Sequence, residues 1–278
     1  MKKFFFYGGL ALVCASTIFS CQQQSLDEVK ADVMTKSDKA LVASAGFNSQ
    51  WVKKNTDGTF LVEGDMHFTT EELQKLTSTP PSHNFVVANE EHYRTTNVVS
   101  VPSSGQRTIT VRLGSGFPTY YSPALDAALA RYNSLNLRIR FQRVSSGGNI
   151  VISGADLGPA TAQGCTLGQA SGFPSGGNPS GGFTLSTNSC ATSSISTQNK
   201  ADEVMAHEIG HCIGFRHTDY ANRASCGGPG EGAGTIGAVF IPGTVGTVTA
   251  SYNSWMMACT NSNPAFSSTD GVALNFVY

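Results

Sequence analysis

Charge is scarce in this chain of 278 residues. Asp, Glu, Lys and Arg make up 13% of it, and the formal net charge is −1, whereas roughly 25% of residues are charged in an ordinary soluble domain. A chain without a basic surface has no electrostatic attraction for nucleic acid, so we predict no nucleic-acid partner. The 30 glycines favour a loop-rich exported protein over a cytosolic enzyme.

Cysteine is missing between residues 22 and 164. Five cysteines follow, all in the second half of the chain: Cys165, Cys190, Cys212, Cys226 and Cys259. Export permits disulfides, and the glycine-rich stretch between the first two favours their pairing. Of the other three, one thiol should stay free. A Cys226–Cys259 bond would tie two loops together, and a Cys212–Cys226 bond is the competing arrangement.

The N-terminus also lacks a hydrophobic run long enough for a membrane span. Its apolar stretch, residues 4–19, falls short of the ~20 residues that a span needs, and two lysines precede it. This pattern predicts a secretory signal peptide over residues 1–20. The letters "IFSC", which end at Cys21, resemble a bacterial lipobox. We therefore expect an outer-membrane or cell-surface lipoprotein, attached to the membrane only through a lipid on Cys21. Cleavage without lipidation, which would give a secreted protein, is the alternative.

Residues 22–105 are richer in charge than the rest and are predicted to form a pro-segment. They include "TTEELQKLTS", a short helix capped by Thr69 or Thr70, and end in a linker over residues 98–106. Residues 106–278 would then form the enzyme proper. The alternative is an N-terminal subdomain that stays attached.

The second part of the chain alternates between strand and helix patterns. Strands are expected at residues 107–113, 137–144, 149–154 and 182–187. Helices are expected at residues 122–135, 199–214 and within 267–278. The helix at 122–135 should be capped by Ser122, and the helix at 199–214 should stop at Gly214.

The helix at 199–214 carries the densest motif of the chain, "AHEIGHCIGFRHTD" (206–219). His207 and His211 lie four residues apart, about 40° around a helix axis, so both imidazoles face the same way. This spacing suits two ligands of one zinc ion, with Glu208 beside them as general base. Gly214 permits a sharp turn, after which His217 can return as third ligand. Three protein ligands leave a fourth position for water, as in a catalytic zinc site.

The pattern HExxHxxGxxH resembles the metzincin zinc peptidases, and its HEIGH core resembles the bacterial group named for that string, which is related to the astacins. "NSWMMAC" (253–259) resembles the methionine turn of metzincins and points to Met256 rather than Met257. The resemblance covers roughly residues 107–278. It implies an α+β fold with a twisted, mostly parallel sheet, an antiparallel edge strand, a backing helix, a zinc helix and a small irregular C-terminal part. We expect "GFTLST" (182–187) to be that edge strand and to pair with extended substrate.

The resemblance further implies a monomeric, zinc-dependent endopeptidase that acts on protein or peptide substrates. One catalytic Zn²⁺ would activate water, with Glu208 as general base. Astacins carry a glutamate after the third histidine and a tyrosine beyond the turn methionine, where this chain has Thr218 and Ala258. Asp219 is expected to take over part of the glutamate's structural role. The alternatives are a lipid-anchored binding module with structural zinc, and a zinc hydrolase of a non-protein amide bond.

A zymogen of this class must keep water from the metal. A thiolate cannot do so here, because residues 22–164 contain no cysteine. Astacin pro-segments use the aspartate of a Phe-x-Gly-Asp motif, which "VEGD" (62–65) resembles. Asp65 would then occupy the metal until the chain is cut between about Glu91 and Arg107. The alternative is a plain turn between two strands.

Overall fold

The computed structural model describes residues 34–77, 92–160, 164–244, 246, 248–259 and 265–278. The predicted signal peptide, Cys21 and Glu91 lie outside the described residues. Within these ranges, no helix has the length and apolar character needed to cross a membrane.

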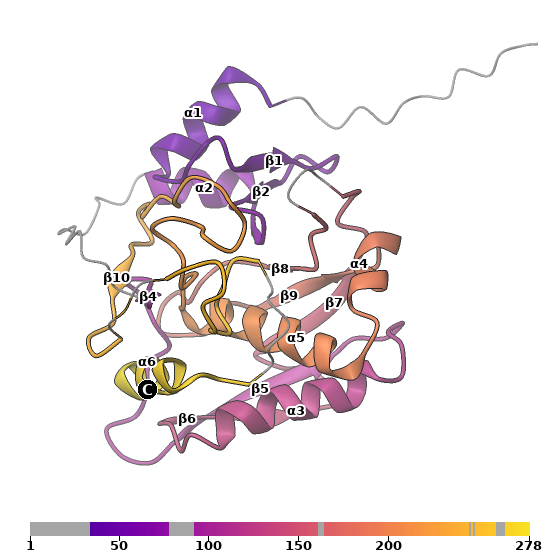
Figure 1. The fold of residues 1–278 in the computed structure, drawn as a ribbon, viewed down its shortest axis with the longest axis vertical. Coiled ribbons are helices and arrows are strands. Elements are labelled where there is room, and N and C mark those ends of the chain that lie inside the picture. Colours follow the sequence, from indigo (N-terminus) through magenta and orange to yellow (C-terminus); the bar gives the residue numbers. More distant parts are fainter. Residues whose placement is uncertain (1–33, 78–91, 161–163, 245, 247, 260–264) are drawn as a thin grey trace, which may run out of the picture. The chain divides into compact units, whose positions relative to one another are not determined.

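Six helices and ten strands are found in the described residues, and Figure 1 shows how they are arranged. The helices are α1 (Lys36–Ser44), α2 (Thr70–Thr77), α3 (Tyr121–Asn133), α4 (Ser189–Ser194), α5 (Gln198–Ile213) and α6 (Ser268–Val277). The strands are β1 (Val52–Lys54), β2 (Phe60–Val62), β3 (Met66–Phe68), β4 (Tyr93–Arg94), β5 (Arg107–Leu113), β6 (Ile139–Arg143), β7 (Ile150–Ala155), β8 (Gly168–Ala170), β9 (Gly182–Ser186) and β10 (Val239–Phe240).

The main sheet has the strand order β1-β2-β3-β8-β9-β7-β5-β6 among the described residues. Strands β6, β5, β7 and β9 run parallel to one another, and β8 is antiparallel to β9. These pairings confirm the predicted α+β fold with a mostly parallel sheet. The hairpin strands β1, β2 and β3 extend the same sheet, because β3 pairs with the outer side of β8.

The prediction that "GFTLST" is the edge strand is wrong. That segment forms β9, which lies between β7 and β8 and therefore has a hydrogen-bonded neighbour on both sides. The antiparallel strand is β8, whose three residues, Gly168 to Ala170, are too short to show an alternating pattern in the sequence. Its free side is covered by β3 of the N-terminal segment.

Helices α3 and α5 pack along each other and against the sheet (Figure 1). In α3 the buried side chains recur at helical spacing, which places Ala124, Leu125, Ala128 and Leu129 in the core. Ser122 was expected to cap this helix, but it lies inside the first turn, and the N-cap Tyr120 makes no side-chain cap bond. Packing of the apolar face, rather than a cap, therefore determines where α3 begins.

The helix α5 has clear start and stop signals. The hydroxyl of Thr197 accepts a hydrogen bond from the backbone N–H of Lys200, and Gly214 ends the helix with φ of 110°. Every residue from Ala201 to Ile213 is buried. This burial is unusual for a helix with so many polar groups, so these groups must find partners inside the protein.

The described residues contain two separate hydrophobic cores. The larger one lies between the sheet and helices α3, α5 and α6, and includes Ile109, Leu125 and Ile209. The smaller one belongs to the N-terminal segment and consists of Val42, Ala45, Phe47, Phe60, Val62, Met66, Phe68 and Leu73. The N-terminal segment therefore packs around its own core while its strand β3 joins the sheet.

Two disulfides tie loops around the sheet and α5. Cys165 pairs with Cys190, and Cys226 pairs with Cys259. Cys212 is the free thiol and is buried on α5. The competing Cys212–Cys226 arrangement is therefore not formed.

Candidate active site

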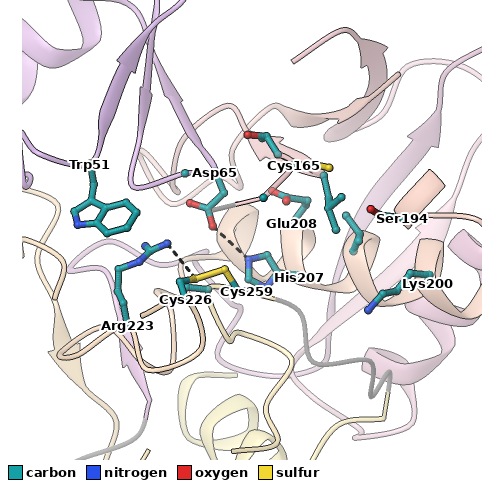
Figure 2. A pocket seen from close by; sticks show the side chains of 17 residues that line it. Trp51, Asp65, Cys165, Ser194, Lys200, His207, Glu208, Arg223, Cys226 and Cys259 are labelled. Carbon is teal, nitrogen blue, oxygen red and sulfur yellow. Dashed lines mark hydrogen bonds and ion pairs between the residues drawn. A yellow bond between two sulfur atoms is a disulfide. The ribbon is translucent and has the colours of Figure 1, made fainter. Parts of the chain in front are cut away.

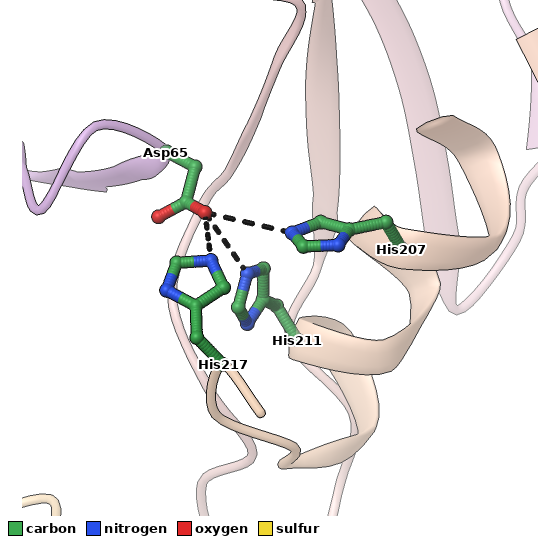
Figure 3. Close-up of side chains that lie close together, drawn as sticks. All are labelled: Asp65, His207, His211 and His217. Carbon is green, nitrogen blue, oxygen red and sulfur yellow. Dashed lines mark hydrogen bonds and ion pairs between the residues drawn. The ribbon is translucent and has the colours of Figure 1, made fainter. Parts of the chain in front are cut away.

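The three histidines of the motif converge on one point (Figure 3). His207 and His211 project from the same face of α5, as their spacing predicts. The chain then turns at Gly214, where a Cβ atom would approach the hydroxyl of Thr95 to 3.1 Å, and returns with His217. All three imidazoles are buried.

Each imidazole is oriented by an acceptor at its Nδ1 atom. His207 Nδ1 donates to the carbonyl oxygen of Trp255 at 2.8 Å, and His211 Nδ1 donates to that of Phe215 at 2.9 Å. His217 Nδ1 contacts the carboxylate of Glu231. A carbonyl oxygen can only accept, so Nδ1 carries the proton and Nε2 presents a lone pair. The Nε2 lone pairs of His207 and His211 therefore face the same space, and Nε2 of His217 faces it as well.

Asp65 lies at this point of convergence (Figure 3). Its Oδ2 atom is 3.5 Å from Nε2 of His207 and 3.3 Å from Nε2 of His211, and it contacts Nε2 of His217. The four ligand atoms lie within 4.8 Å of one another. A carboxylate that faces three imidazole Nε2 atoms requires a cation or protons among them. Three imidazoles and one carboxylate are a donor set that fits four-coordinate zinc.

The electrostatics of the site point the same way. Burial opposes charge on Asp65, yet His217 and His211 hold the pKa of its carboxyl well below the ordinary range. Burial also opposes charge on His217, but the carboxylates of Asp65 and Glu231 raise its pKa to about 10. The site therefore attracts positive charge.

Asp65 lies in the turn of a hairpin. Strands β2 and β3 pair antiparallel, and the residues between them form the hairpin turn, Glu63 to Asp65. Glu63 and Gly64 both have positive φ, of 54° and 94°. The two sequence interpretations of "VEGD" thus coexist: the segment is a turn between strands, and the turn places Asp65 at the histidines.

Glu208 lies beside His207 with its carboxyl group against β8. A methyl group at Gly168 would overlap Oε1 of Glu208, so this strand position admits only glycine while the carboxyl is there. Oε2 of Glu208 has no hydrogen-bond partner among the residues that the structure describes. Burial, together with the charge of Asp65, raises the pKa of Glu208 well above its ordinary range.

A cavity of about 510 Å³ opens beside these groups (Figure 2). Asp65, His207 and Glu208 line it together with Lys200 and Arg223. The cavity brings Gly168 of β8, two of the candidate metal ligands and Glu208 into one space, so a bound group would meet all three.

Met256 lies beneath the histidines. It is fully buried, and a Cβ atom at Gly210 would overlap its sulfur. The same segment orients both ends of the motif, because Trp255 accepts from His207 and the carbonyl oxygen of Met256 accepts from the backbone N–H of Thr218 at 2.7 Å. The glycine of HEIGH therefore makes room for the methionine turn.

Sequence reasoning missed Glu231. Asp219 was expected to replace the glutamate that astacins carry, and it is buried, but it accepts from the backbone N–H groups of Ser225 and Ala258, each at 2.9 Å. The carboxylate that contacts His217 comes from Glu231, in a glycine-rich loop. A single acid in such a loop carries no local signal that could have identified it.

Comparison with known proteins gives a family match over most of the chain. A family model described as "Dual-action HEIGH metallo-peptidase" matches residues 60–278. Solved structures that align with the chain include myroilysin, with 17% identity, 64% of this chain and 82% of that one covered, and a TM-score of 0.36. Another is high choriolytic enzyme 1, a hatching enzyme zinc-protease from Oryzias latipes (medaka fish), with 16% identity, coverages of 65% and 93%, and a TM-score of 0.35. No curated protein matches the sequence.

Proposed function

The chain belongs to the family of dual-action HEIGH metallopeptidases, and on this premise we propose that it is a zinc endopeptidase with Glu208 as its general base. The observation that carries the proposal is the convergence of three histidine Nε2 atoms on one buried point beside Glu208. His207, His211 and His217 would hold the zinc ion, which supplies Lewis acidity for the attack on a peptide carbonyl when it is bound.

The residues around this point have separable roles. Glu208 takes a proton from the attacking water and passes it to the leaving amine, and its raised pKa suits a group that must both accept and donate. Strand β8 offers backbone groups to an extended peptide, since β3 already uses this edge in the same way. Met256 fills the space under α5 and contributes packing only.

We further propose that the hairpin turn keeps the uncut chain inactive. Asp65 takes the fourth donor position, and its backbone oxygen accepts from the N–H of Ala170 on β8 at 2.8 Å. Glu63 anchors the turn from the other side: Oε2 accepts from Arg216 at 2.8 Å, and Oε1 accepts from the N–H of Gly232 at 3.0 Å. The turn thus fills the fourth donor position of the metal site and also covers the edge of β8 with which a substrate would pair.

The removable segment should end before His92. The ring of His92 contacts Asp270 at 2.8 Å, the carbonyl oxygen of Tyr93 accepts from Arg216, and the N–H of Thr95 donates to Gly214. These contacts hold residues 92–95 against the residues that follow, so we take residues 92–278 together as the peptidase part. A cut that leaves them in place preserves the turn after α5, so we place it at the N-terminal end of the predicted interval.

Metal content tests the site directly. The purified protein should bind one zinc ion per chain, and His207→Ala, His211→Ala and His217→Ala should each lose most of it, because the remaining donors leave an incomplete site. Chelation should abolish casein cleavage by the activated enzyme, and added zinc should restore it. Full zinc occupancy in all three variants would show that the assignment is wrong.

A substitution of Asp65 tests the inactive state. Asp65→Ala should make the uncut chain active. The control, Asp57→Ala, removes an exposed acid from the same segment and should leave the uncut chain inactive. Both variants should be assayed beside uncut wild type with a quenched fluorescent peptide mixture. An active uncut wild type, or an Asp65→Ala chain as silent as its parent, would rule out this role.

The proposal includes export and a lipid on Cys21. Two disulfides suit a chain that matures in an oxidising compartment. Mass spectrometry of the mature protein from its native host should show cleavage before Cys21 and an added lipid mass. A mature N-terminus at another residue would contradict the lipoprotein assignment.

A further inference from the structure

Glu231 lies in the glycine-rich loop after α5, 14 residues beyond His217. Its side chain is fully buried. Oε1 contacts Nδ1 of His217 and also accepts from Arg223 at 2.7 Å, while Oε2 accepts from Arg216 at 3.2 Å. Both oxygens of this carboxylate are therefore engaged, and one of them touches an imidazole of the metal site.

We propose that Glu231 is a positioning residue of the metal centre, which acts through Nδ1 of His217 to fix the tautomer and the ring orientation of the third ligand. This inference rests on the proposed function, because it takes His217 to be a metal ligand. An acceptor at Nδ1 places the lone pair on Nε2 and makes that atom a stronger donor to a metal.

The three histidines differ in how much support the backbone gives them. His207 and His211 stand on a rigid helix, and backbone carbonyl oxygens accept from their Nδ1 atoms. His217 follows the turn at Gly214 and has no helix behind it. It is also the one ligand whose Nδ1 partner is a charged side chain, and charge-assisted hydrogen bonds are about twice as strong as neutral ones.

Two arginines hold Glu231 in one orientation. Arg216 is buried against the rings of Phe173 and Tyr220, and it donates to the carbonyl oxygens of Ala233 and Gly237. Its Nη2 atom donates to the carboxylates of Glu63 and Glu231 and to the carbonyl oxygen of Gly232. Arg223 is buried as well and stacks on Trp51.

The two arginines connect the metal site to the residues around it. A buried guanidinium keeps its charge and needs a carboxylate beside it. Glu231 meets that need for both arginines and still presents Oε1 to His217. The chain thus places the acceptor for its third ligand through tertiary contacts of a loop that has no regular structure.

The experiment uses the full-length chain with zinc removed and then titrated. Zinc affinity is measured by competition with a chromophoric chelator for wild type, Glu231→Gln and Glu231→Ala. Removal of such a partner typically weakens metal binding about 10- to 100-fold. We expect Glu231→Ala at the upper end and Glu231→Gln, which keeps one acceptor oxygen, at the lower end.

The matched control is Asp202→Ala. Asp202 is a buried carboxylate on α5 that pairs with Arg131 and touches none of the histidines. The Asp202→Ala variant should keep the zinc affinity of wild type even if its melting temperature is lower. Co²⁺ substitution gives a measurement that general destabilisation would not change. The visible absorption band of bound Co²⁺ should shift in both Glu231 variants and not in Asp202→Ala.

Nuclear magnetic resonance of the zinc-free chain supplies a second such readout. Both ring nitrogens of His217 contact carboxylates in this chain, Nε2 that of Asp65 and Nδ1 that of Glu231, so the Nδ1–H signal of the ring should shift in Glu231→Ala and not in Asp202→Ala. If Glu231→Ala does not fold, Glu231→Gln decides by the same measurements.

Two results would overturn the inference. One is unchanged zinc affinity and an unchanged Co²⁺ spectrum in the Glu231 variants while wild type binds zinc. The other is an equal loss of affinity in Asp202→Ala, which would mark the effect as general destabilisation. A wild-type chain that binds no zinc would overturn the proposed function as well, so the two failures are distinguishable.

Discussion

The α5 region (residues 198–217) and the hairpin turn meet at the same four ligand atoms, but they are built in different ways. The α5 region is buried in the large core, and its three imidazoles are each oriented by contacts within the peptidase part. The hairpin turn belongs to a segment with its own core of eight buried residues. One donor group thus comes from a region that does not share the core of the other three.

The segment that carries the hairpin turn contacts the rest of the protein at the site and along the loop after α5, where the N–H groups of Gly234 and Thr235 donate to the carbonyl oxygens of Gly46 and Ala45 at 2.9 and 3.2 Å. Strand β3 pairs with β8 through a single register pair, Met66 with Ala170, and the carboxylates of Glu63 and Asp65 supply the charged contacts. The difference leads us to expect that the histidines are the permanent part of the site and that Asp65 is the donor that activation removes.

The largest expected effect lies on the α5 side. Glu208→Gln keeps the size of the side chain but removes the base, so hydrolysis by the cut enzyme should fall by about 10²- to 10⁴-fold. Zinc content should not change, because Glu208 is not among the converging donors. Initial rates and metal analysis of the same preparation measure the hydrolysis rate and the zinc content. Wild-type activity in this variant would remove Glu208 from the mechanism.

The second effect separates the two cores. Phe60 is buried in the small core, and Phe60→Ala should cost that core about 3–5 kcal/mol. Hydrogen exchange should then show lost protection in residues 36–68 and retained protection in α5. The uncut chain should also gain activity, because Asp65 is no longer held in place.

A control in the large core completes that test. Ile109→Ala, which removes a fully buried side chain there, should lower the stability of the peptidase part and give no activity to the uncut chain. Loss of protection in α5 on Phe60→Ala would show that the two cores unfold together, and the comparison between the two regions would fail.

The smallest effect concerns Met256. Met256→Leu conserves volume beneath α5 and should lower the free energy of unfolding by less than about 1.5 kcal/mol. Zinc content should stay at the wild-type level, since the residue packs against Gly210 rather than facing the converging donors. Denaturant titration measures the stability change. A loss of zinc at unchanged stability would give Met256 a direct part in binding.

Much of the peptidase part could be predicted from the sequence because its signals are local. Strand β5 covers the predicted residues 107–113, and α5 ends at Gly214 as its stop signal indicates. Edge position could not be predicted, because it depends on which strands pair. Strand β8 is three residues long and shows no periodicity, and β9 looks like an edge strand until its second neighbour is known.

The sequence by itself determined the three-histidine arrangement, because helix periodicity and one glycine bring His207, His211 and His217 together within eleven residues. Only the tertiary structure decided the rest of the site. Asp65 lies 146 residues before His211, and Glu231 lies in a loop without a pattern. Their positions follow from strand pairing at the sheet edge and from the need of buried arginines for carboxylate partners. Such long-range contacts leave no periodic trace in the chain.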